Sequence, residues 1–330
     1  MAMKRTEDCL RANTNTHLSG YTAANEFPIK LIKMGKFVLN NHSRIKPIHI
    51  QLVPTNKCDC NCSWCSCSEV DRKLELSYQE LMDISKWFAG LGAKAVTITG
   101  GGEPTLHKDL HTLITNMKVL HNYRVGLVTN GGFVKKDNEQ LIHSIEYNVD
   151  WVRLSITDRL TDHGIRTFCE TFKRPKIGFS HTVSDQSDIE TAVGIAKIAE
   201  AYDNVTHVRY VTNILDPNPK LLMAVKNSCE GVTDKGIYQD RSDYTKGTPN
   251  CLISLLKPVI DASGYVYPCC GVQYAIDTQR QMPESMRMCH WKDFAKTMHF
   301  NGSICGKCYY EQYNKALLKI VKTVNDELFI

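Results

Sequence analysis

The 330-residue sequence lacks long apolar runs, a secretion signal and a strong charge of either sign. Its hydrophobic stretches fall far short of the roughly 20 residues that a membrane-spanning helix needs. Near its start, Lys4, Arg5, Glu7 and Asp8 stand where a secretion signal has an apolar core. We therefore expect a soluble, cytoplasmic protein with no membrane partner.

The charge balance is mild, with 40 Lys and Arg against 35 Asp and Glu and a formal net charge of +5. This small surplus permits a polyanionic partner such as nucleic acid without requiring one. No recognisable nucleic-acid module accompanies it. A chain of this length can bury a large core and build one big domain plus a small one.

Cysteine, in contrast, is abundant, with 14 in the chain. Clustered spacings in a chain of this size indicate metal ligation in a reducing compartment. Five cysteines lie within residues 57–67, and Cys58-x3-Cys62-x2-Cys65 offers three thiolates on one loop. Three thiolates can hold three irons of a [4Fe–4S] cluster and leave the fourth iron without a protein ligand. A zinc knot and a structural disulfide cluster are the alternatives.

After this loop, helical and strand patterns alternate along the chain. A capping box at Ser77 and Glu80 opens a helix that ends at Gly90 or Gly92. Alternation of this kind means a parallel sheet, and six such units predict an α/β fold, a partial (β/α)6 TIM-like barrel. The six strands are expected at 48–53, 95–99, 124–129, 151–156, 177–183 and 207–212, and the further helices at 107–120, 138–147, 164–173 and 188–202.

Polar and glycine-rich segments follow these strands, at the sheet edge that carries the chemistry in parallel α/β folds. The run Gly100-Gly101-Gly102-Glu103-Pro104 comes directly after the second strand, and three glycines allow a ligand to approach the backbone closely. Alone, such a run is more often a tight turn. Asn130 and Ser155, at the ends of the third and fourth strands, are equally compatible with turns or helix caps.

The cysteine triad and the Gly-Gly-Glu-Pro run about forty residues later together resemble the radical S-adenosylmethionine (radical SAM) superfamily. This resemblance implies that S-adenosylmethionine binds the open iron and that one electron cleaves it to a 5′-deoxyadenosyl radical. It also implies an aromatic residue near the adenine, a glycine backbone that receives the methionine amino group, and polar contacts to the ribose and carboxylate. The cofactor-binding residues implied are Trp64, Gly101, Gly102, Glu103, Asn130 and Ser155.

His181 and Arg209 lie at the ends of the fifth and sixth strands. Each points either into the barrel mouth or outward towards the helices, and the pattern alone does not decide between them. We take both as candidate catalytic residues on the substrate side, and assign no other catalytic residue beyond the cluster.

A second cysteine set follows residues 214–250, whose Pro, Asn, Asp, Gly and Lys content predicts a linker with a helical stretch at 219–227. Within this set, Gly264 marks the turn of a β-hairpin. The set resembles the short "twitch" form of the SPASM auxiliary domain, which implies a second [4Fe–4S] cluster. A structural zinc ribbon is the competing interpretation. The implied ligands are Cys251, Cys269, Cys305 and Cys308, and Cys270 and Cys289 are surplus cysteines able to replace one of them.

The expected organisation has four parts. An N-terminal strap with a short helix at 28–40 precedes the barrel, and the chain ends in an amphipathic helix. No separate leader-binding domain is expected before residue 48. The parts are residues 1–47 for the strap, 48–213 for the barrel, 214–250 for the linker and 251–330 for the auxiliary-cluster domain.

The resemblance implies a radical SAM enzyme that abstracts a hydrogen atom from a substrate C–H bond. A fully ligated second cluster suits electron transfer, hence net oxidation. The implied partners are an electron donor such as flavodoxin or ferredoxin and a substrate that the sequence does not name. The alternatives are modification or isomerisation of a nucleotide or nucleic-acid base, as in phage DNA or tRNA hypermodification, peptide maturation, and a non-catalytic iron–sulfur or zinc scaffold.

Overall fold

The computed structural model describes residues 45–136, 138–242, 244–276 and 280–322. Residues 1–44 of the predicted strap, with its helix at 28–40, lie outside these residues. One sheet of ten strands organises the described chain, in the spatial order β10-β9-β8-β1-β2-β3-β4-β5-β6-β7. The strands are β1 (His49–Leu52), β2 (Ala95–Ile98), β3 (Arg124–Thr129), β4 (Trp151–Ile156), β5 (Lys176–Val183), β6 (Val205–Thr212), β7 (Gly236–Gln239), β8 (Val259–Ile260), β9 (Tyr265–Tyr267) and β10 (Cys289–His290).

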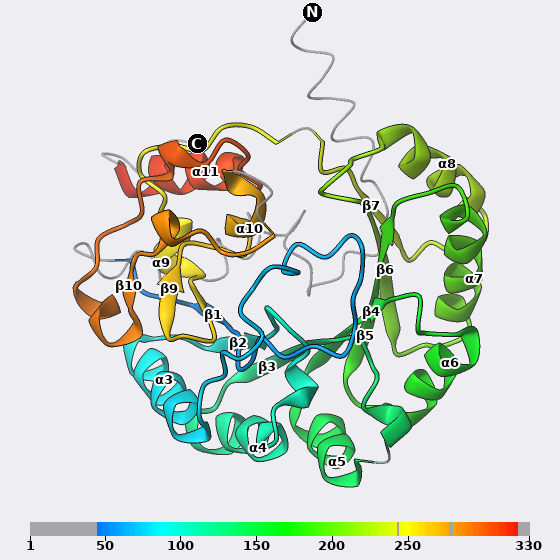
Figure 1. The fold of residues 1–330 in the computed structure, drawn as a ribbon, viewed down its shortest axis with the longest axis horizontal. Helices are drawn as coiled ribbons and strands as arrows, with labels where there is room; N and C mark the ends of the chain where they lie inside the picture. The colour runs from blue at the N-terminus through cyan, green and yellow to red at the C-terminus, as the bar shows by residue number, and fades with distance from the viewer. Residues whose placement is uncertain (1–44, 137, 243, 277–279, 323–330) are drawn as a thin grey trace, which may run out of the picture.

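Strands β1 to β7 run parallel in chain order, and the helices between them cover the outer side of the curved sheet (Figure 1). This arrangement confirms the predicted partial barrel, and the six predicted strands match to within two residues. The helices are α3 (Tyr78–Leu91), α4 (Leu110–His121), α5 (Glu139–Asn148), α6 (Asp162–Thr171), α7 (Asp188–Glu200), α8 (Pro219–Cys229), α9 (Ile253–Leu256), α10 (Val272–Ala275) and α11 (Glu311–Lys322).

Helix α3 shows how local sequence sets the element boundaries. The Ser77 side chain accepts a hydrogen bond from the backbone N–H of Glu80, and the Glu80 carboxylate accepts one from the backbone N–H of Ser77 at 2.9 Å. This is the predicted capping box. The helix ends at Gly92, whose φ of 119° is a left-handed conformation that favours glycine.

Side chains alternate along each strand between the hydrophobic core under the helices and the cavity inside the barrel. In β4, Val152, Leu154 and Ile156 are buried in the hydrophobic core. Arg153 and Ser155, on the other face of the same strand, line the central cavity. Because successive side chains of a strand point to opposite faces, one strand supplies both the packing against the helices and the polar wall of the cavity.

The stretch predicted as a linker contributes one more strand. The helical part is confirmed as α8, but the sequence analysis missed β7, which pairs in parallel with β6 from Val208 beside Gly236 to Val211 beside Gln239. Four residues with a glycine at one end give too short a pattern to identify a strand.

The C-terminal segment continues the same sheet from its β1 edge. The predicted hairpin is present as β8 and β9, and Gly264 in its turn has a φ of +81°. β8 pairs in parallel with β1, through Gln51 beside Val259, and β9 pairs with β10. The division into a barrel and an auxiliary domain stays a prediction, and strands from both parts share one sheet.

Helix α11 lies against the start of the C-terminal segment. Leu317 is fully buried in a cluster with Leu252, Ile253, Leu256 and Tyr310. The rest of the predicted amphipathic helix, beyond Lys322, lies outside the described residues. Over the described chain, the helices are too short or too polar to cross a membrane.

Candidate active site

The three glycines after β2 pack against the segment that leads into the first cysteine loop. A Cβ atom on Gly101 would lie 2.2 Å from Oδ1 of Asn56, and one on Gly102 would lie 2.0 Å from the carbonyl oxygen of Lys57. A Cβ on Gly100 would lie 1.8 Å from the Gly102 carbonyl oxygen. No larger residue fits at these positions, so the glycines set how closely β2 and the loop approach.

Glu103 stabilises this contact through hydrogen bonds. Its backbone N–H donates to the carbonyl oxygen of Lys57 at 2.7 Å. Its buried carboxylate accepts hydrogen bonds from the hydroxyls of Thr105 and Thr129 and from the backbone N–H of Asn130, each at 2.7 Å. Burial raises the pKa of Glu103, while these donors favour the ionised form. Glu103 thus ties together the ends of β2, β3 and the cysteine loop, and direct contact with a cofactor stays a prediction.

Asn130 holds the cysteine loop from the end of β3. Its Nδ2 atom donates to Oδ1 of Asp59 at 2.9 Å and to Sγ of Cys60 at 3.2 Å, while its Oδ1 accepts from the backbone N–H of Gly132. Arg159 also donates to the backbone carbonyl of Asp59. The loop is therefore fixed by side chains from two further βα units.

The predicted cluster ligands Cys58, Cys62 and Cys65 all line the central cavity. Sγ of Cys58 accepts a hydrogen bond from the backbone N–H of Cys60 at 3.5 Å, and Sγ of Cys65 accepts one from Cys67 at 3.3 Å. Burial raises the pKa of Cys58, while the Cys60 donor favours its thiolate, the form that binds iron. Burial and the neighbouring thiols raise the pKa of Cys62 to about 12. The loop thus gathers soft thiol donors that need a bound cation to ionise together, and this donor set fits an iron–sulfur cluster.

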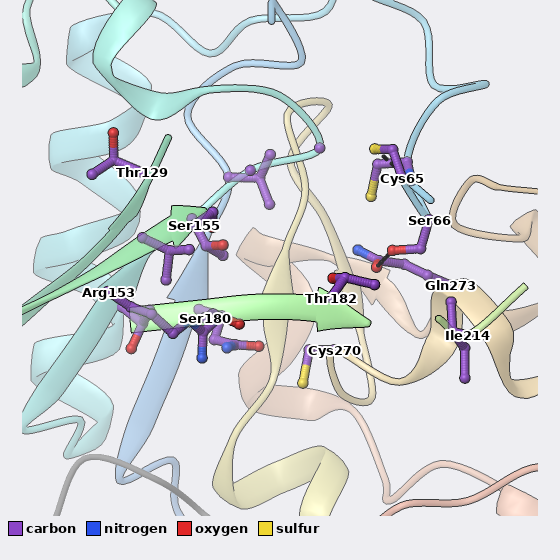
Figure 2. Close-up of a pocket in the computed structure, with 18 of the residues that line it drawn as sticks. Cys65, Ser66, Thr129, Arg153, Ser155, Ser180, Thr182, Ile214, Cys270 and Gln273 are labelled. Carbon is purple, nitrogen blue, oxygen red and sulfur yellow. Dashed lines mark hydrogen bonds between the residues drawn. The ribbon is translucent and has the colours of Figure 1, made fainter. Parts of the chain in front are cut away.

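The cavity enclosed by the barrel and the C-terminal segment has a volume of about 390 Å³. Figure 2 shows Cys65 and Ser66 on one side of it, with Thr129 and Ser155 from the strand ends on another. The structure thus brings the predicted cofactor residues to the same space as the cysteine loop. Those that line the cavity are Trp64, Gly101, Gly102, Glu103, Asn130 and Ser155.

The structure places the two candidate catalytic residues, His181 on β5 and Arg209 on β6, on opposite sides of the sheet. Arg209 lines the cavity, as expected for a substrate-side residue. On β5 the cavity-facing positions belong to Ser180 and Thr182, so His181 points towards the helices, where its Nε2 atom lies 2.9 Å from Oδ1 of Asp188. The structure therefore corrects the expectation for His181, because strand alternation places it on the packed face.

The cysteines of the second set pack close to one another in the C-terminal segment. Burial raises the pKa of Cys251, Cys269, Cys305 and Cys308, and charge on Cys251 raises the pKa of both Cys269 and Cys305. Sγ of Cys269 accepts the backbone N–H of Gly271 at 3.3 Å. Cys251 and Cys308 likewise accept backbone N–H groups. All four predicted ligands therefore come together, most with donors that favour a thiolate.

The two surplus cysteines lie in different surroundings. Cys289, on β10, packs against the barrel core and its thiol hydrogen bonds to the Thr297 side chain. Cys270 lines the central cavity, 3.6 Å from the hydroxyl of Tyr310.

Across the described ranges, no three His, Cys, Asp or Glu side chains are arranged to hold a single metal ion.

A direct hydrogen bond joins the two cysteine-bearing segments. The hydroxyl of Ser66, in the first loop, donates to Oε1 of Gln273 on α10 at 2.8 Å (Figure 2). Gln273 and Cys270 line the cavity together with the first cysteine loop, whereas the four predicted ligands of the second set do not line it.

Sequence reasoning missed several residues of the cavity wall. Arg153 carried a usable signal, because it lies two residues before Ser155 and must share its face of β4. Nothing in the sequence placed Arg241 and Lys257 at the cavity, because they lie in segments without a periodic pattern. Tyr274 and Tyr309 also line the cavity from the C-terminal segment.

Comparison with known proteins agrees with this geometry. Residues 52–176 match the family model described as the Radical SAM superfamily. The matched range runs from the end of β1 to the start of β5 and includes the cysteine loop and the glycine run. This part of the chain is therefore similar to the radical SAM superfamily.

Similarity to individual proteins is partial. The chain is 29% identical over 161 residues to GTP 3′,8-cyclase of Staphylococcus aureus, a match that covers 46% of this chain and 44% of that protein. The chain thus aligns with less than half the length of these curated relatives. In structure, it resembles Streptococcus suis SuiB bound to S-adenosylmethionine, with a TM-score of 0.56, 15% identity and coverage of 88% of this chain and 73% of SuiB. It also resembles anSMEcpe bound to AdoMet and the Kp18Cys peptide, with a TM-score of 0.54, 15% identity and coverage of 82% and 88%.

The glycine contact makes a testable prediction. We expect Gly102→Ala to destabilise the protein by about 1–3 kcal/mol, because the new Cβ would overlap backbone atoms of the cysteine loop. It should also lower the iron bound by the first cysteine set. Denaturant unfolding and iron analysis measure the two effects.

Gly90→Ala is the matched control, because Gly90 lies in α3 and a Cβ added there would have no atom within 4 Å outside its own helix backbone and chain neighbours. Its substitution should be neutral or stabilise by about 0.5–1 kcal/mol. Equal stability and iron content in the two variants would contradict the packing argument.

Proposed function

We propose that this chain is a radical SAM enzyme that removes a hydrogen atom from an unactivated C–H bond of a small substrate. Cys58, Cys62 and Cys65 would hold a [4Fe–4S] cluster with S-adenosylmethionine on its open iron. Together these groups supply a 5′-deoxyadenosyl radical after one-electron reduction. The observation that carries the proposal is the cysteine triad on the wall of a cavity at the carboxyl ends of parallel strands, locked there by the glycine run.

The chain's own residues bind and orient the reactants and exclude water. Gly101 and Gly102 leave backbone groups beside the cysteine loop, and Trp64 offers a ring for the adenine. Asn130 and Ser155 offer polar groups to the ribose and carboxylate. A cavity of about 390 Å³ lies in the range of small-molecule sites, which favours a small substrate or a short segment of a larger one.

The second cysteine set, Cys251, Cys269, Cys305 and Cys308, is proposed to hold an auxiliary [4Fe–4S] cluster. Four thiolates leave no open iron, which suits transfer of an electron rather than binding of a reactant. After loss of a hydrogen atom, the substrate radical would release one electron to this cluster and one proton to solvent, for a net two-electron oxidation. A zinc site is the alternative, because four cysteines are also a zinc ligand set.

Two other substrate classes have support from the comparisons. The curated relatives are GTP 3′,8-cyclases, which favours modification or isomerisation of a nucleotide or nucleic-acid base. A SuiB structure contains a precursor peptide and an anSMEcpe structure contains the Kp18Cys peptide, which favours peptide maturation. In each case we propose a cytoplasmic enzyme with a reductant such as flavodoxin or ferredoxin.

The first-cluster assignment is tested by single substitutions. Cys58→Ala, Cys62→Ala and Cys65→Ala should each abolish cleavage of S-adenosylmethionine to 5′-deoxyadenosine in reduced, anaerobic protein, because each removes an iron ligand. Chromatography of the nucleoside product measures this.

Cys60→Ala and Cys67→Ala serve as controls within the same loop. Their sulfurs interact with the side chains of Asn130 and Ser66 respectively, and they should largely retain cleavage. If Cys60 proved essential and Cys58 dispensable, the ligand assignment would be wrong.

Metal content tests the auxiliary cluster. Reconstituted protein should carry about eight irons per chain in two [4Fe–4S] clusters and no stoichiometric zinc. Replacing Cys305 and Cys308 together should remove roughly half of this iron, while the first cluster still cleaves S-adenosylmethionine. The Cys289→Ala variant should keep its full iron content, because Cys289 packs against the barrel core. One zinc and four irons per chain would refute the auxiliary-cluster assignment.

Isotope transfer separates the roles of the two clusters. With a substrate deuterated at the reacting carbon, the Cys305/Cys308 double variant should still pass deuterium into 5′-deoxyadenosine, because abstraction needs only the radical. Its product yield should fall sharply if the reaction is an oxidation. Survival of product formation would indicate a redox-neutral isomerisation. Loss of deuterium transfer in a folded variant would show that the C-terminal segment helps to position the substrate.

A further inference from the structure

Four cationic side chains lie on the wall of the central cavity. Arg153 comes from β4, Arg209 from β6, Arg241 from the segment after β7, and Lys257 from the segment before β8. Glu103 is the only acidic residue among the described residues that line this cavity. Four cationic side chains against one carboxylate give the wall an excess of positive charge, and the Glu103 carboxylate accepts hydrogen bonds from Thr105, Thr129 and Asn130.

The arginines have no compensating partner in the described chain. The Nε atoms of Arg209 and Arg241 are buried without a hydrogen-bond partner. No ion pair of the described residues involves Arg153, Arg209 or Arg241. Burial and the charges of Arg153 and Arg241 lower the pKa of Arg209 to about 9. The guanidinium groups therefore lie close enough to repel one another.

His207 is too close to these cations to become protonated, and a neutral imidazole does not offset their charge. Burial and the charges of Arg153 and Arg209 lower its pKa to about 3. Lys257 is turned towards Tyr310, with its Nζ atom 3.4 Å from the tyrosine hydroxyl. The neighbouring groups are thus neutral or cationic.

Buried like charges without a partner are costly, and arginine is suited to bidentate contacts with phosphate or carboxylate oxygens. A carboxylate would bring one negative charge to three guanidinium groups. A phosphate ester brings about two, and its several oxygens can accept hydrogen bonds from more than one guanidinium group at once. Charge and hydrogen-bonding capacity therefore both favour a phosphate group.

The aromatic side chains beside the arginines are consistent with a bound organic phosphate. Tyr274, Tyr309 and Tyr310 line the same cavity, and Tyr244 stacks on Tyr274 with ring centroids 5.8 Å apart. Burial raises the pKa of each of these tyrosines, so their hydroxyls remain neutral hydrogen-bond donors. They provide apolar faces for the rest of a ligand.

Arg153 lies apart from the cysteine loop within the cavity. In Figure 2, Arg153 lies with Ser180 at the lower left, well apart from Cys65 at the upper right. A phosphate held here would leave the space towards the cysteine loop for the rest of the molecule.

We propose that Arg153, Arg209 and Arg241 bind a phosphate group of the substrate. That this phosphate belongs to the substrate rests on the proposed function, whereas the phosphate site itself rests on the residues of the cavity wall. The enzyme would then act on a phosphorylated small molecule, held by its phosphate at one side of the cavity with its reacting carbon towards the cysteine loop.

Binding of simple anions to the cluster-loaded protein tests this site without S-adenosylmethionine. Thermal unfolding is followed under anaerobic conditions against inorganic phosphate, sulfate and acetate, at constant ionic strength set with sodium chloride. Phosphate should raise the Tm saturably, sulfate should act similarly as a second dianion, and acetate should have little effect. Failure of radical chemistry does not affect this result, so the two proposals can fail separately.

Arg209→Gln and Arg241→Gln should each weaken phosphate binding by about 10- to 100-fold, because a charge-assisted hydrogen-bond donor is lost. Arg174→Gln is the matched control, since Arg174 is exposed and lies over the Tyr147 ring, and it should bind phosphate like the parent protein. Without phosphate, the Arg209→Gln protein should unfold at the same Tm as the parent or higher, because a repelling charge is gone. An arginine with a purely structural role would instead lower the Tm.

Three results would overturn the proposal. One is a phosphate effect that does not saturate, or that is equal in the parent, Arg209→Gln and Arg241→Gln proteins. Another is abolition of the phosphate effect by S-adenosylmethionine, which would assign the arginines to the cofactor. The third is an unchanged phosphate affinity together with a shifted reduction potential of the second cluster, which would show that the arginines act on that cluster.

Discussion

The contact between the glycine run and the base of the cysteine loop is the constraint on which the site depends. Gly102 meets backbone atoms of Asn56 and Lys57, and Gly101 meets the Asn56 side chain, so a Cβ atom at either glycine would push the loop away from the end of β2. Arg72 reinforces this junction, because its guanidinium donates to the carbonyl oxygens of Asn56 and Gly101, each at 3.0 Å. The glycines therefore have a packing role in addition to any contact with a cofactor.

The sequence predicted well those features that depend on residues close together in the chain. Cysteine spacing, the capping box at Ser77 and the alternation of β4 each depend on neighbours in the chain, and the corresponding elements are present in the structure. The period of a strand tells which residues share a face but not which face is inside. His181 and Arg209 illustrate this, because only the register of the assembled sheet separates them.

Features that depend on long-range pairing were beyond sequence reasoning. Strand β7 is identified by its ladder with β6 rather than by its four residues. Arg241 and Lys257 reach the cavity from irregular segments, and only the closed arrangement of the barrel and the C-terminal segment brings them beside Arg153. An excess of charge in one cavity is a property of the fold, since the net charge of the whole chain is mild.

The pairing of β8 with β1 has a consequence for how the protein is made. These strands are about 200 residues apart in sequence, and Gln51 meets Val259 only after the whole barrel has been synthesised. Contacts of such long separation form slowly and late in folding. The edge of β1 and the cysteine loop that follows it therefore stay accessible in the growing chain. Cys58, Cys62 and Cys65, the proposed cluster ligands, are thus open to solvent until the C-terminal segment pairs with the β1 edge.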